Sequence, residues 1–552
     1  MNKLSITIFA ALAGLMAAPA RGGEYISQVW QADMGNGNYR NPIINADYSD
    51  PDVCRVGDDF YMTASSFTNL PGLPILHSKD LVNWTIVNYA VEKLEPSGYF
   101  NRAQHGGGIW APSIRHHNGE FYIYWGDPDH GIYMVKSSDP LGKWEAPVLV
   151  AKTKGVIDPC PLWDSDGRAY LVCGWAKSRS GLNSVLTVAE MAPDGKSLIG
   201  DPVAVYDGMP DGNHTVEGPK FYKRGDWYYI LAPAGGVATG WQLALRSKSP
   251  YGPYEQKVVM AQGKTDINGP HQGAWIDTPD GKEDWFIHFQ DRGVIGRVIH
   301  LNPVKWTEDW PVIGVDKDGD GCGEPVKTYK KPAVAAKVAK SSPQESDDFN
   351  TTELGKQWQW FANYRAPFGF ATPYGYYRLY GQSAQNFVNM RQIPNILTQK
   401  FPNDTFTATA KVTVSGTQDG QESGIIIMGR DYARLAVEKR GDNFEIKLVE
   451  CIGADQNNHE KSYDVALLPA SRLNCEVPAA TSDIDLWLRV KVGKDYKCTF
   501  SYSTDGKRFI DCGHSFTARE GHWIGARVGF FSIMPQGHSR GWIDIDSFTI
   551  TK

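Results

Sequence analysis

The chain lacks several features that would place it in other classes of protein. Beyond its N-terminal residues it has no long apolar run, so the remaining sequence predicts no membrane-spanning helix. It also has no excess of basic residues, because 56 Lys and Arg stand against 62 Asp and Glu, a formal net charge of -6. Such a balance gives no basic surface for nucleic acid or for an anionic membrane. We therefore expect neither partner.

Cysteine is scarce, with 8 in 552 residues, too few for a fold held together by disulfides. Cys54, Cys160 and Cys173 lie in apolar, strand-like patterns and are expected to be buried as small hydrophobic side chains. Four later cysteines could pair in an oxidising compartment, and the sequence leaves that pairing open: Cys451, Cys475, Cys498 and Cys512.

The N-terminus carries the one apolar run. A polar start with Lys3 is followed by apolar residues and then by Ala18-Pro19-Ala20, which predicts a secretory signal peptide over residues 1–20. The run is too short for a stable membrane span. No cysteine follows the predicted cleavage site, so a lipid anchor is not indicated. We expect an exported protein, periplasmic or secreted.

An internal repeat is present, and it predicts the fold. Each unit has a short turn, apolar alternation, a Gly turn and an aromatic-rich strand. The units recur about every 50–60 residues, the length of a four-stranded propeller blade. Five units predict a five-bladed β-propeller over residues 24–325, whereas a sandwich of many short strands would not explain the period. The units begin at Ser49, Trp110, Ile157, Val216 and His271.

The composition changes after the fifth unit. Residues 326–345 are rich in Lys, Ala, Pro and Ser, which predicts a linker. Residues 346–552 show the alternation of β-strands without helical periodicity, which predicts a two-sheet β-sandwich. The expected fold class is therefore all-β, with a propeller followed by a sandwich.

Aligning the repeats places Asp50, Asp158, Glu217 and His271 at equivalent positions near the start of a unit. Equivalent positions in a propeller are related by rotation about one axis, so these side chains should converge on one mouth of the central channel. An Asp before Pro is often a turn residue, but Glu is a poor one. Crowded carboxylates raise at least one pKa, which suits acid–base catalysis. Binding of a divalent cation is the competing interpretation, ahead of a purely structural role.

Several motifs in this order resemble glycoside hydrolase family 43. They are "NADYSDPDVCRVGDDFYMTASSF", "GGGIWAPS", "VIDPCPLW", "TVEGPKFY" and "HQGAW". "DDFNTTELGKQWQW", from Asp347, resembles the concanavalin-like sandwich of the family's β-xylosidase and α-L-arabinofuranosidase branch. The resemblance covers nearly all of the chain after the predicted signal peptide.

The resemblance implies hydrolysis with inversion by two carboxyl groups. Asp50 matches the general base, Glu217 the general acid, and Asp158 the residue that orients Glu217 and raises its pKa. An inverting pair stands about 6.5–9.5 Å apart to admit a water, whereas a retaining pair is about 5–5.5 Å apart.

Other residues match the family's sugar pocket. Trp110 and Phe67 match its aromatic walls, although core packing is the commoner fate of such residues, and Arg297 matches a pocket arginine. His271 matches a histidine that contacts a calcium ion in the propeller channel through water. The resemblance implies no cofactor for the chemistry itself.

The expected function is an exo-acting glycosidase that releases a terminal pentose from plant cell-wall polysaccharide or its oligosaccharides. Resemblance to the sandwich-bearing branch favours α-L-arabinofuranose, with β-xylosidase activity on xylo-oligosaccharides as the alternative. A non-catalytic carbohydrate-binding propeller is the more distant alternative, and the presence of all three acids argues against it.

Overall fold

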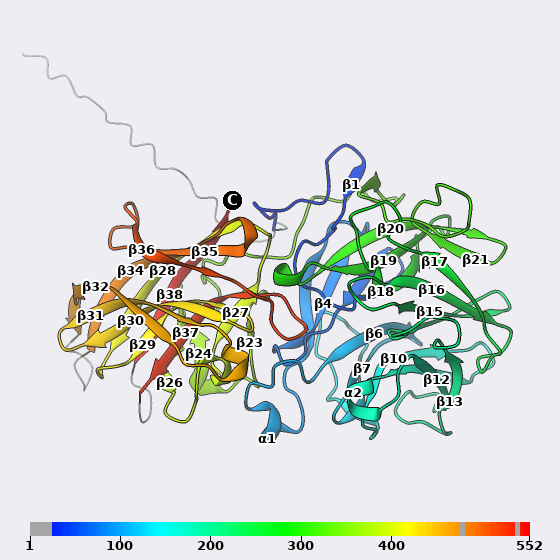
Figure 1. Cartoon of the computed structure of the whole chain (residues 1–552), viewed down its shortest axis with the longest axis horizontal. Helices are drawn as coiled ribbons and strands as arrows, with labels where there is room; N and C mark the ends of the chain where they lie inside the picture. The colour runs from blue at the N-terminus through cyan, green and yellow to red at the C-terminus, as the bar shows by residue number, and fades with distance from the viewer. Residues whose placement is uncertain (1–24, 475–480, 536–540) are drawn as a thin grey trace, which may run out of the picture.

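The structure is a computed structural model that describes residues 25–474, 481–535 and 541–552. It is all-β, with an N-terminal domain drawn in blue to green and a C-terminal domain in yellow to red (Figure 1). The predicted signal peptide lies outside the described residues. None of the helices in the described ranges has the length and apolar character needed to cross a membrane. They are α1 (Ser97–Phe100), α2 (Lys177–Ser180) and the 3-10 turns Gly293–Ile295, Ala366–Phe368, Met390–Gln392, Ala454–Gln456 and Lys494–Tyr496.

The N-terminal domain is a five-bladed β-propeller, as predicted. Each blade is a four-stranded antiparallel sheet with its strands in chain order. Blade 1 is β2 (Asp52–Val56), β3 (Asp59–Thr63), β4 (Gly72–Ser78) and β5 (Thr85–Val91), and blade 2 is β6 (Trp110–His117), β7 (Glu120–Asp127), β8 (Gly131–Ser137) and β9 (Val148–Ala151). Blade 3 is β10 (Val156–Trp163), β11 (Ala169–Trp175), β12 (Val185–Met191) and β13 (Val203–Asp207). Blade 4 is β14 (Lys220–Arg224), β15 (Trp227–Ala234), β16 (Trp241–Ser247) and β17 (Glu255–Met260), and blade 5 is β18 (His271–Asp277), β19 (Asp284–Asp291), β20 (Arg297–Thr307) and β21 (Trp310–Ile313).

The first strand of each blade lines the centre of the ring. Strand β6 contacts both β2 and β10, β10 contacts β14, and β18 contacts β2, so blade 5 closes the ring against blade 1. The turn after each of these strands holds the glycine that marks the repeat, with φ between 58° and 86° at all five positions. A side chain would meet no atom there, so the left-handed backbone itself explains the glycines.

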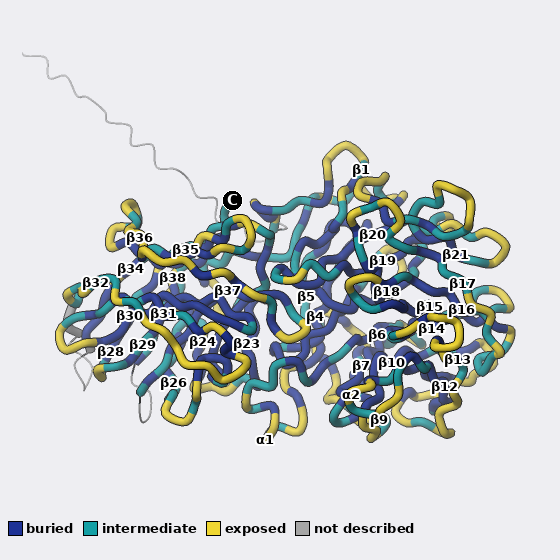
Figure 2. The backbone as a smooth tube through the Cα atoms, viewed as in Figure 1, coloured by how far each residue is buried: buried dark blue, intermediate teal, exposed yellow. Residues whose placement is uncertain are grey.

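The C-terminal domain is a β-sandwich of two eight-stranded sheets. The first sheet contains β23 (Gln359–Trp360), β26 (Gln382–Ser383), β27 (Leu397–Lys400), β29 (Glu422–Met428), β30 (Tyr432–Arg440), β31 (Asn443–Cys451), β32 (Lys461–Pro469) and β37 (Arg527–Met534). The second sheet contains β24 (Gly369–Ala371), β25 (Tyr377–Tyr380), β28 (Phe406–Gly416), β33 (Arg472–Asn474), β34 (Thr481–Val492), β35 (Lys497–Ser503), β36 (Ile510–Thr517) and β38 (Trp542–Thr551). Buried stretches run through the middle of both domains, and the exposed residues gather in the turns (Figure 2).

The two domains share apolar contacts. Val29, Ile295 and Val298 of the propeller belong to the same buried cluster as the sandwich core. The backbone of Leu70 pairs with that of Trp360 through two hydrogen bonds of 2.9 and 2.7 Å. The domains therefore meet along a buried seam.

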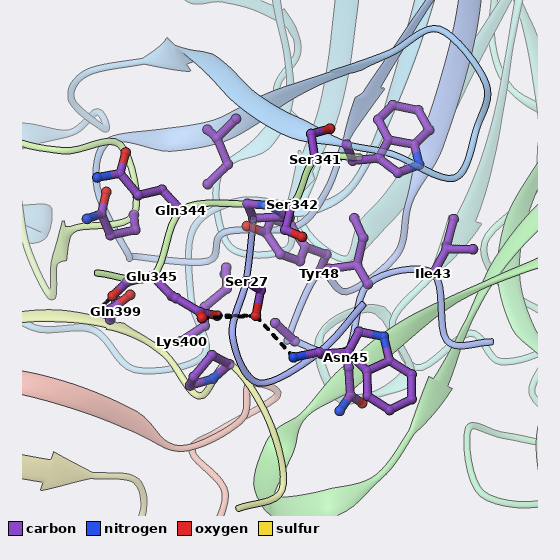
Figure 3. Close-up of a pocket in the computed structure, with 18 of the residues that line it drawn as sticks. Ser27, Ile43, Asn45, Tyr48, Ser341, Ser342, Gln344, Glu345, Gln399 and Lys400 are labelled. Carbon is purple, nitrogen blue, oxygen red and sulfur yellow. Dashed lines mark hydrogen bonds between the residues drawn. The ribbon is translucent and has the colours of Figure 1, made fainter. Parts of the chain in front are cut away.

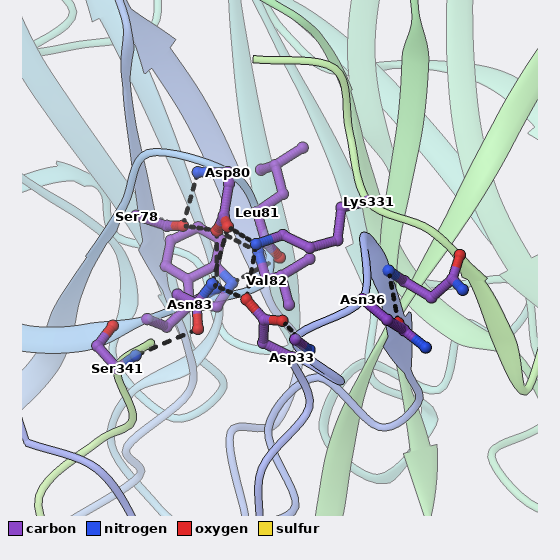
Figure 4. Close-up of polar contacts among 12 residues, drawn as sticks. Asp33, Asn36, Ser78, Asp80, Leu81, Val82, Asn83, Lys331 and Ser341 are labelled. Atoms are coloured by element: carbon purple, nitrogen blue, oxygen red, sulfur yellow. Dashed lines mark hydrogen bonds and ion pairs between the residues drawn. The ribbon is translucent and has the colours of Figure 1, made fainter. Parts of the chain in front are cut away.

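The predicted linker is ordered against the propeller. Within it, β22 (Thr328–Lys330) pairs with β1 (Asn38–Arg40). Lys331 Nζ lies 2.7 Å from a carboxylate oxygen of Asp33 and equally close to one of Asp80, both buried (Figure 4). These contacts fix the path of the linker across the first blade.

A cavity of about 60 Å³ remains where the N-terminal segment, the linker and the sandwich meet (Figure 3). Ser27 Oγ donates to the carboxylate of Glu345 at 2.9 Å, and burial raises the pKa of Glu345 to about 7. Burial also lowers the pKa of Lys400 to about 7. The cavity belongs to the seam between the domains.

The cysteines agree with the sequence where they are described. Cys54, Cys160 and Cys173 are buried, as predicted. No disulfide is formed among the described cysteines, which include Cys451, Cys498 and Cys512. Cys475 lies outside the described residues.

Candidate active site

The structure places the four aligned residues where the repeat predicts, at the start of innermost strands. Asp50 precedes β2, Asp158 lies in β10, Glu217 precedes β14, and His271 is the first residue of β18. Each of these strands belongs to a different blade, so residues far apart in sequence meet at one end of the channel. The charge of Asp158 interacts with those of both Glu217 and Asp50. The three carboxylates thus form one site.

Local backbone geometry turns these side chains into the site. Asp50 and Asp158 both have φ of 55°, a left-handed conformation that is unfavourable for most residues and tolerated by Asp. Strand β10 has a bulge between Ile157 and Cys160, which interrupts the alternation of side chains at Asp158. Two left-handed aspartates at equivalent positions indicate a functional constraint.

The glycine after Glu217 in the motif "TVEGPKFY" is required by the local backbone and packing. Gly218 has φ of 58°, and a Cβ there would lie 2.3 Å from the side chain of Gln272. The amide of Gly218 donates a 2.7 Å hydrogen bond to Asp158 Oδ2. Asp158 therefore holds the backbone next to Glu217, which gives the two acids a fixed relation.

Asp50 is buried among hydrogen-bond donors. The hydroxyls of Ser49 and Ser65 donate to Asp50 Oδ2 at 2.7 and 2.5 Å. Arg297 Nη1 lies 3.3 Å from Asp50 Oδ1 and donates to Ser49 Oγ at 2.7 Å. Charge-assisted donors of this kind stabilise a negatively charged carboxylate, which is the form that a general base needs.

Asp158 and Glu217 form a carboxyl pair of unequal exposure. Burial, followed by the neighbouring charge of Glu217, raises the pKa of Asp158 well above its ordinary value. The neutral form of Asp158 is therefore favoured relative to an ordinary aspartate. Asp158 is 2% exposed, whereas the side chain of Glu217 is 29% exposed, so Glu217 is the member that a substrate can reach.

His271 contacts Glu217 directly. Its Nε2 lies 3.0 Å from Glu217 Oε1, and the ring is fully buried. The other ring nitrogen, Nδ1, is buried and has no hydrogen-bond partner among the described residues. His271 thus fixes the orientation of Glu217 through Nε2, while its buried Nδ1 remains available for another hydrogen-bond partner.

The predicted aromatic residues lie together at the site. The rings of Phe67 and Trp110 are 6.3 Å apart in an edge-to-face arrangement, and Phe67 is buried whereas Trp110 is partly exposed. The structure thus brings Phe67 and Trp110 into contact with each other, and Arg297 into contact with Asp50.

Trp523 completes this wall, and the sequence did not predict it. It lies in the loop before β37 of the sandwich, yet its ring is 6.1 Å from that of Trp110. The guanidinium of Arg297 lies 5.8 Å from the centre of the Trp523 ring. The loop is fixed by the propeller, since the amide of Ala526 donates to the carbonyl of Val294 at 2.7 Å. The only signal in the sequence was a tryptophan in a polar loop, "REGHWIGA".

Trp523→Ala is expected to weaken substrate binding more than turnover. The ring is 45% exposed and touches no carboxylate that would move protons, so its loss removes about 1–1.5 kcal/mol of aromatic contact with the sugar. That corresponds to a roughly tenfold rise in KM with a small change in kcat. Trp523→Phe, which keeps a ring, should restore most of the affinity. An unchanged KM in the Ala variant would place Trp523 outside the sugar pocket.

Three carboxylates from separate blades meet at one end of a five-bladed propeller, beside an arginine and aromatic rings, and carboxyl groups of this kind carry out glycoside hydrolysis. The comparisons agree, and the chain belongs to glycoside hydrolase family 43. Residues 39–311 match the family described as glycosyl hydrolases family 43. Residues 346–551 match the beta xylosidase C-terminal concanavalin A-like domain, which confirms the predicted resemblance for both parts of the chain.

Two relatives and one solved structure illustrate the similarity. A protein of Xylanibacter ruminicola named "Putative beta-xylosidase" is 38% identical over 91% of this chain and 88% of its own length. The non-reducing end alpha-L-arabinofuranosidase BoGH43B of Bacteroides ovatus is 32% identical over 75% of this chain and 79% of its own. A crystal structure of a mutant of the GH43 protein BlXynB from Bacillus licheniformis is 25% identical, with a TM-score of 0.78 over 93% of this chain and 99% of that one.

Proposed function

We propose that the protein is an inverting exo-glycosidase that releases terminal β-D-xylose from xylo-oligosaccharides. A relative that is 38% identical over most of both chains carries a β-xylosidase name, whereas the relative named for arabinofuranose is 32% identical over 75% of the chain. The order predicted from the sequence, with α-L-arabinofuranose first, is not confirmed. Arabinofuranosidase activity becomes the second candidate, and a non-catalytic propeller is not supported in a chain of this family.

The geometry that supports hydrolysis is the unequal environment of the carboxyl groups. Asp50, surrounded by donors, would remove a proton from a water molecule as its oxygen attacks the anomeric carbon. Glu217, the accessible member of the carboxyl pair, would give its proton to the departing glycosidic oxygen. Asp158 would position Glu217 through its hydrogen bond from the amide of Gly218. After each turnover Asp50 would release to solvent the proton that it took from water, and Glu217 would regain one from solvent, since part of its side chain is exposed.

A calcium ion in the channel is a further part of this proposal. The buried Nδ1 of His271 and the buried Oε1 of Gln272, both without partners among the described residues, fit the hydration shell of such an ion. Within the described ranges the one group of three acidic residues close enough to bind a metal directly is elsewhere, in the surface turn at Asp316, Asp318 and Asp320. The ion would stabilise the charge around Glu217, and no proton transfer depends on it.

We also propose that the chain is exported, to the periplasm or the medium. The support is the sequence of residues 1–20, with its basic start, apolar run and Ala-Pro-Ala end. Polymeric or oligomeric sugars outside the cell would then be available to the enzyme.

Two measurements on aryl glycosides and xylobiose test the proposed function. We expect kcat/KM to be higher on an aryl β-D-xyloside than on an aryl α-L-arabinofuranoside. Proton NMR of xylobiose hydrolysis should show α-xylose as the first-formed anomer, because a single displacement inverts the anomeric centre. A preference for the arabinofuranoside would restore the second candidate, and β-xylose as the first product would contradict the inverting mechanism.

A further inference from the structure

The outer face of the second sandwich sheet carries a hollow of about 390 Å³. Strands β25, β28 and β38 build it, since alternate residues of each strand point away from the sandwich core. Ile543 and Ile545 of β38 are buried in that core, whereas Trp542 and Asp544 lie on the outer face. The residues that line the hollow include Tyr376, Arg378, Thr413, Ser415, Trp542 and Asp544.

Strand register brings the lining residues into two rows. Arg378 and Thr413 lie opposite Asp544 on either side, and Tyr380 and Ser415 lie opposite Trp542. The hollow is therefore made by regular sheet geometry rather than by loops, so its polar groups have fixed spacing.

The floor of the hollow is polar and acidic on balance, since Asp483, Asp544 and Asp546 line it beside one arginine, Arg378. Arg378 forms a bidentate pair with Asp544, with both N–O distances 2.7 Å. Lys411 lies 3.2 Å from Asp546. Each carboxylate oxygen keeps a lone pair that can accept a hydrogen bond from a hydroxyl, and Thr413 and Ser415 add hydroxyl groups. Such a floor offers hydrogen-bond acceptors and donors to the hydroxyl groups of a neutral polyol, and its acidic balance disfavours an anion.

Aromatic rings lie in and beside this floor, since Tyr376 and Trp542 line the hollow and Tyr374 adjoins Tyr376. Tyr374 is 81% exposed and its ring is stacked with that of Tyr376 at a centroid distance of 6.4 Å. Phe370, at the edge of the sheet, is 45% exposed. The guanidinium of Arg378 lies 4.4 Å from the Trp542 ring centre, which holds that indole in place. Exposed, fixed rings beside hydroxyl and carboxylate groups match the apolar face and the hydroxyl edge of a pyranose.

We propose that this hollow is a second, non-catalytic site that binds a neutral oligosaccharide or polysaccharide chain. The catalytic carboxylates lie in the propeller, and Trp523, in the loop before β37 of the first sheet, lies against Trp110 on that side of the molecule. The hollow lies on the outer face of the opposite sheet, so it can hold a chain while the active site works on an end. That the chain is a xylan rests on the proposed function.

Affinity electrophoresis in gels that contain soluble xylan tests the site. The parent is Glu217→Gln, and xylose is added to occupy the active site. Removal of the exposed ring in Glu217→Gln/Tyr374→Ala should reduce the retardation by xylan at least fivefold. Glu217→Gln/Tyr329→Ala is the matched control, because Tyr329 is a 37% exposed tyrosine on the propeller side, and its retardation should equal that of the parent.

The single variant Tyr374→Ala should keep the wild-type kcat/KM on an aryl β-D-xyloside, which shows that the propeller is intact. Equal retardation of the Tyr374→Ala and parent proteins would overturn the proposal, as would retardation that requires added Ca²⁺ and is lost with EDTA. The proposed function fails independently of this site. It would be contradicted by a wild-type enzyme that does not hydrolyse xylosides, regardless of how strongly xylan retards the protein in the gel.

Discussion

Glu217→Gln is expected to lower kcat on xylobiose by roughly 10²–10⁴-fold, the usual contribution of a general acid. The departing sugar oxygen is a poor leaving group, so it needs the proton that Glu217 supplies. The phenolate of an aryl glycoside with an acidic phenol can leave without that proton. For such a substrate, kcat should therefore fall about tenfold or less. The measurement is kcat on the two substrates with the same enzyme preparation.

The matched control for this variant is Glu255→Gln. Glu255 pairs with Arg246 on the outer strands of blade 4, away from the carboxylates, and its side chain is 62% exposed. This control should keep wild-type activity on both substrates. If Glu217→Gln loses activity equally on xylobiose and the aryl glycoside, Glu217 does not act as the acid.

Asp50→Asn is expected to lower kcat by roughly 10²–10⁴-fold on xylobiose and on the aryl glycoside alike. Every substrate needs the activated water, so the quality of the leaving group should not matter. Asn preserves the volume and can still accept from Ser49 and Ser65, so the loss measures the missing base rather than a collapsed site.

Asp291→Asn is the control for Asp50. Asp291 also lies near Arg297, at 3.7 Å, but precedes β20 and does not join the carboxylate group. The Asp291→Asn variant should lose little kcat on either substrate. Near-normal turnover by Asp50→Asn would remove Asp50 as the base, and a loss in Asp291→Asn as large as that in Asp50→Asn would indicate that the charge balance at Arg297 is what matters.

Most of what could be predicted from the sequence, the fold and the three acids of the site, came from the internal repeat. A rotational repeat relates positions by symmetry, so aligning Asp50, Asp158 and Glu217 was enough to place three distant acids in one site. The turn glycines supported the same alignment, because their left-handed backbone recurs in every blade. The five blades and the sandwich were predicted correctly for this reason.

Trp523 could not be found in this way. No symmetry relates the sandwich to the propeller, so nothing in the sequence shows which loop of one domain reaches the other. The path of the linker could not be predicted either, because a run of lysines and alanines does not show what it packs against. Its order comes from Lys331, whose partners Asp33 and Asp80 lie hundreds of residues away. The choice between xylose and arabinose depends on pocket shape, which no single motif encodes.

The apolar seam between the domains has a consequence for engineering and for the evolution of the chain. Val29 and Ile295, both in the propeller, complete the core of the sandwich. Separation would expose such side chains to water at a cost of about 1.5–3 kcal/mol each. The sandwich is therefore not an appendage that can be cut away or moved to another enzyme. A recombination event that joins this propeller to a foreign partner must preserve the seam as well as the catalytic residues.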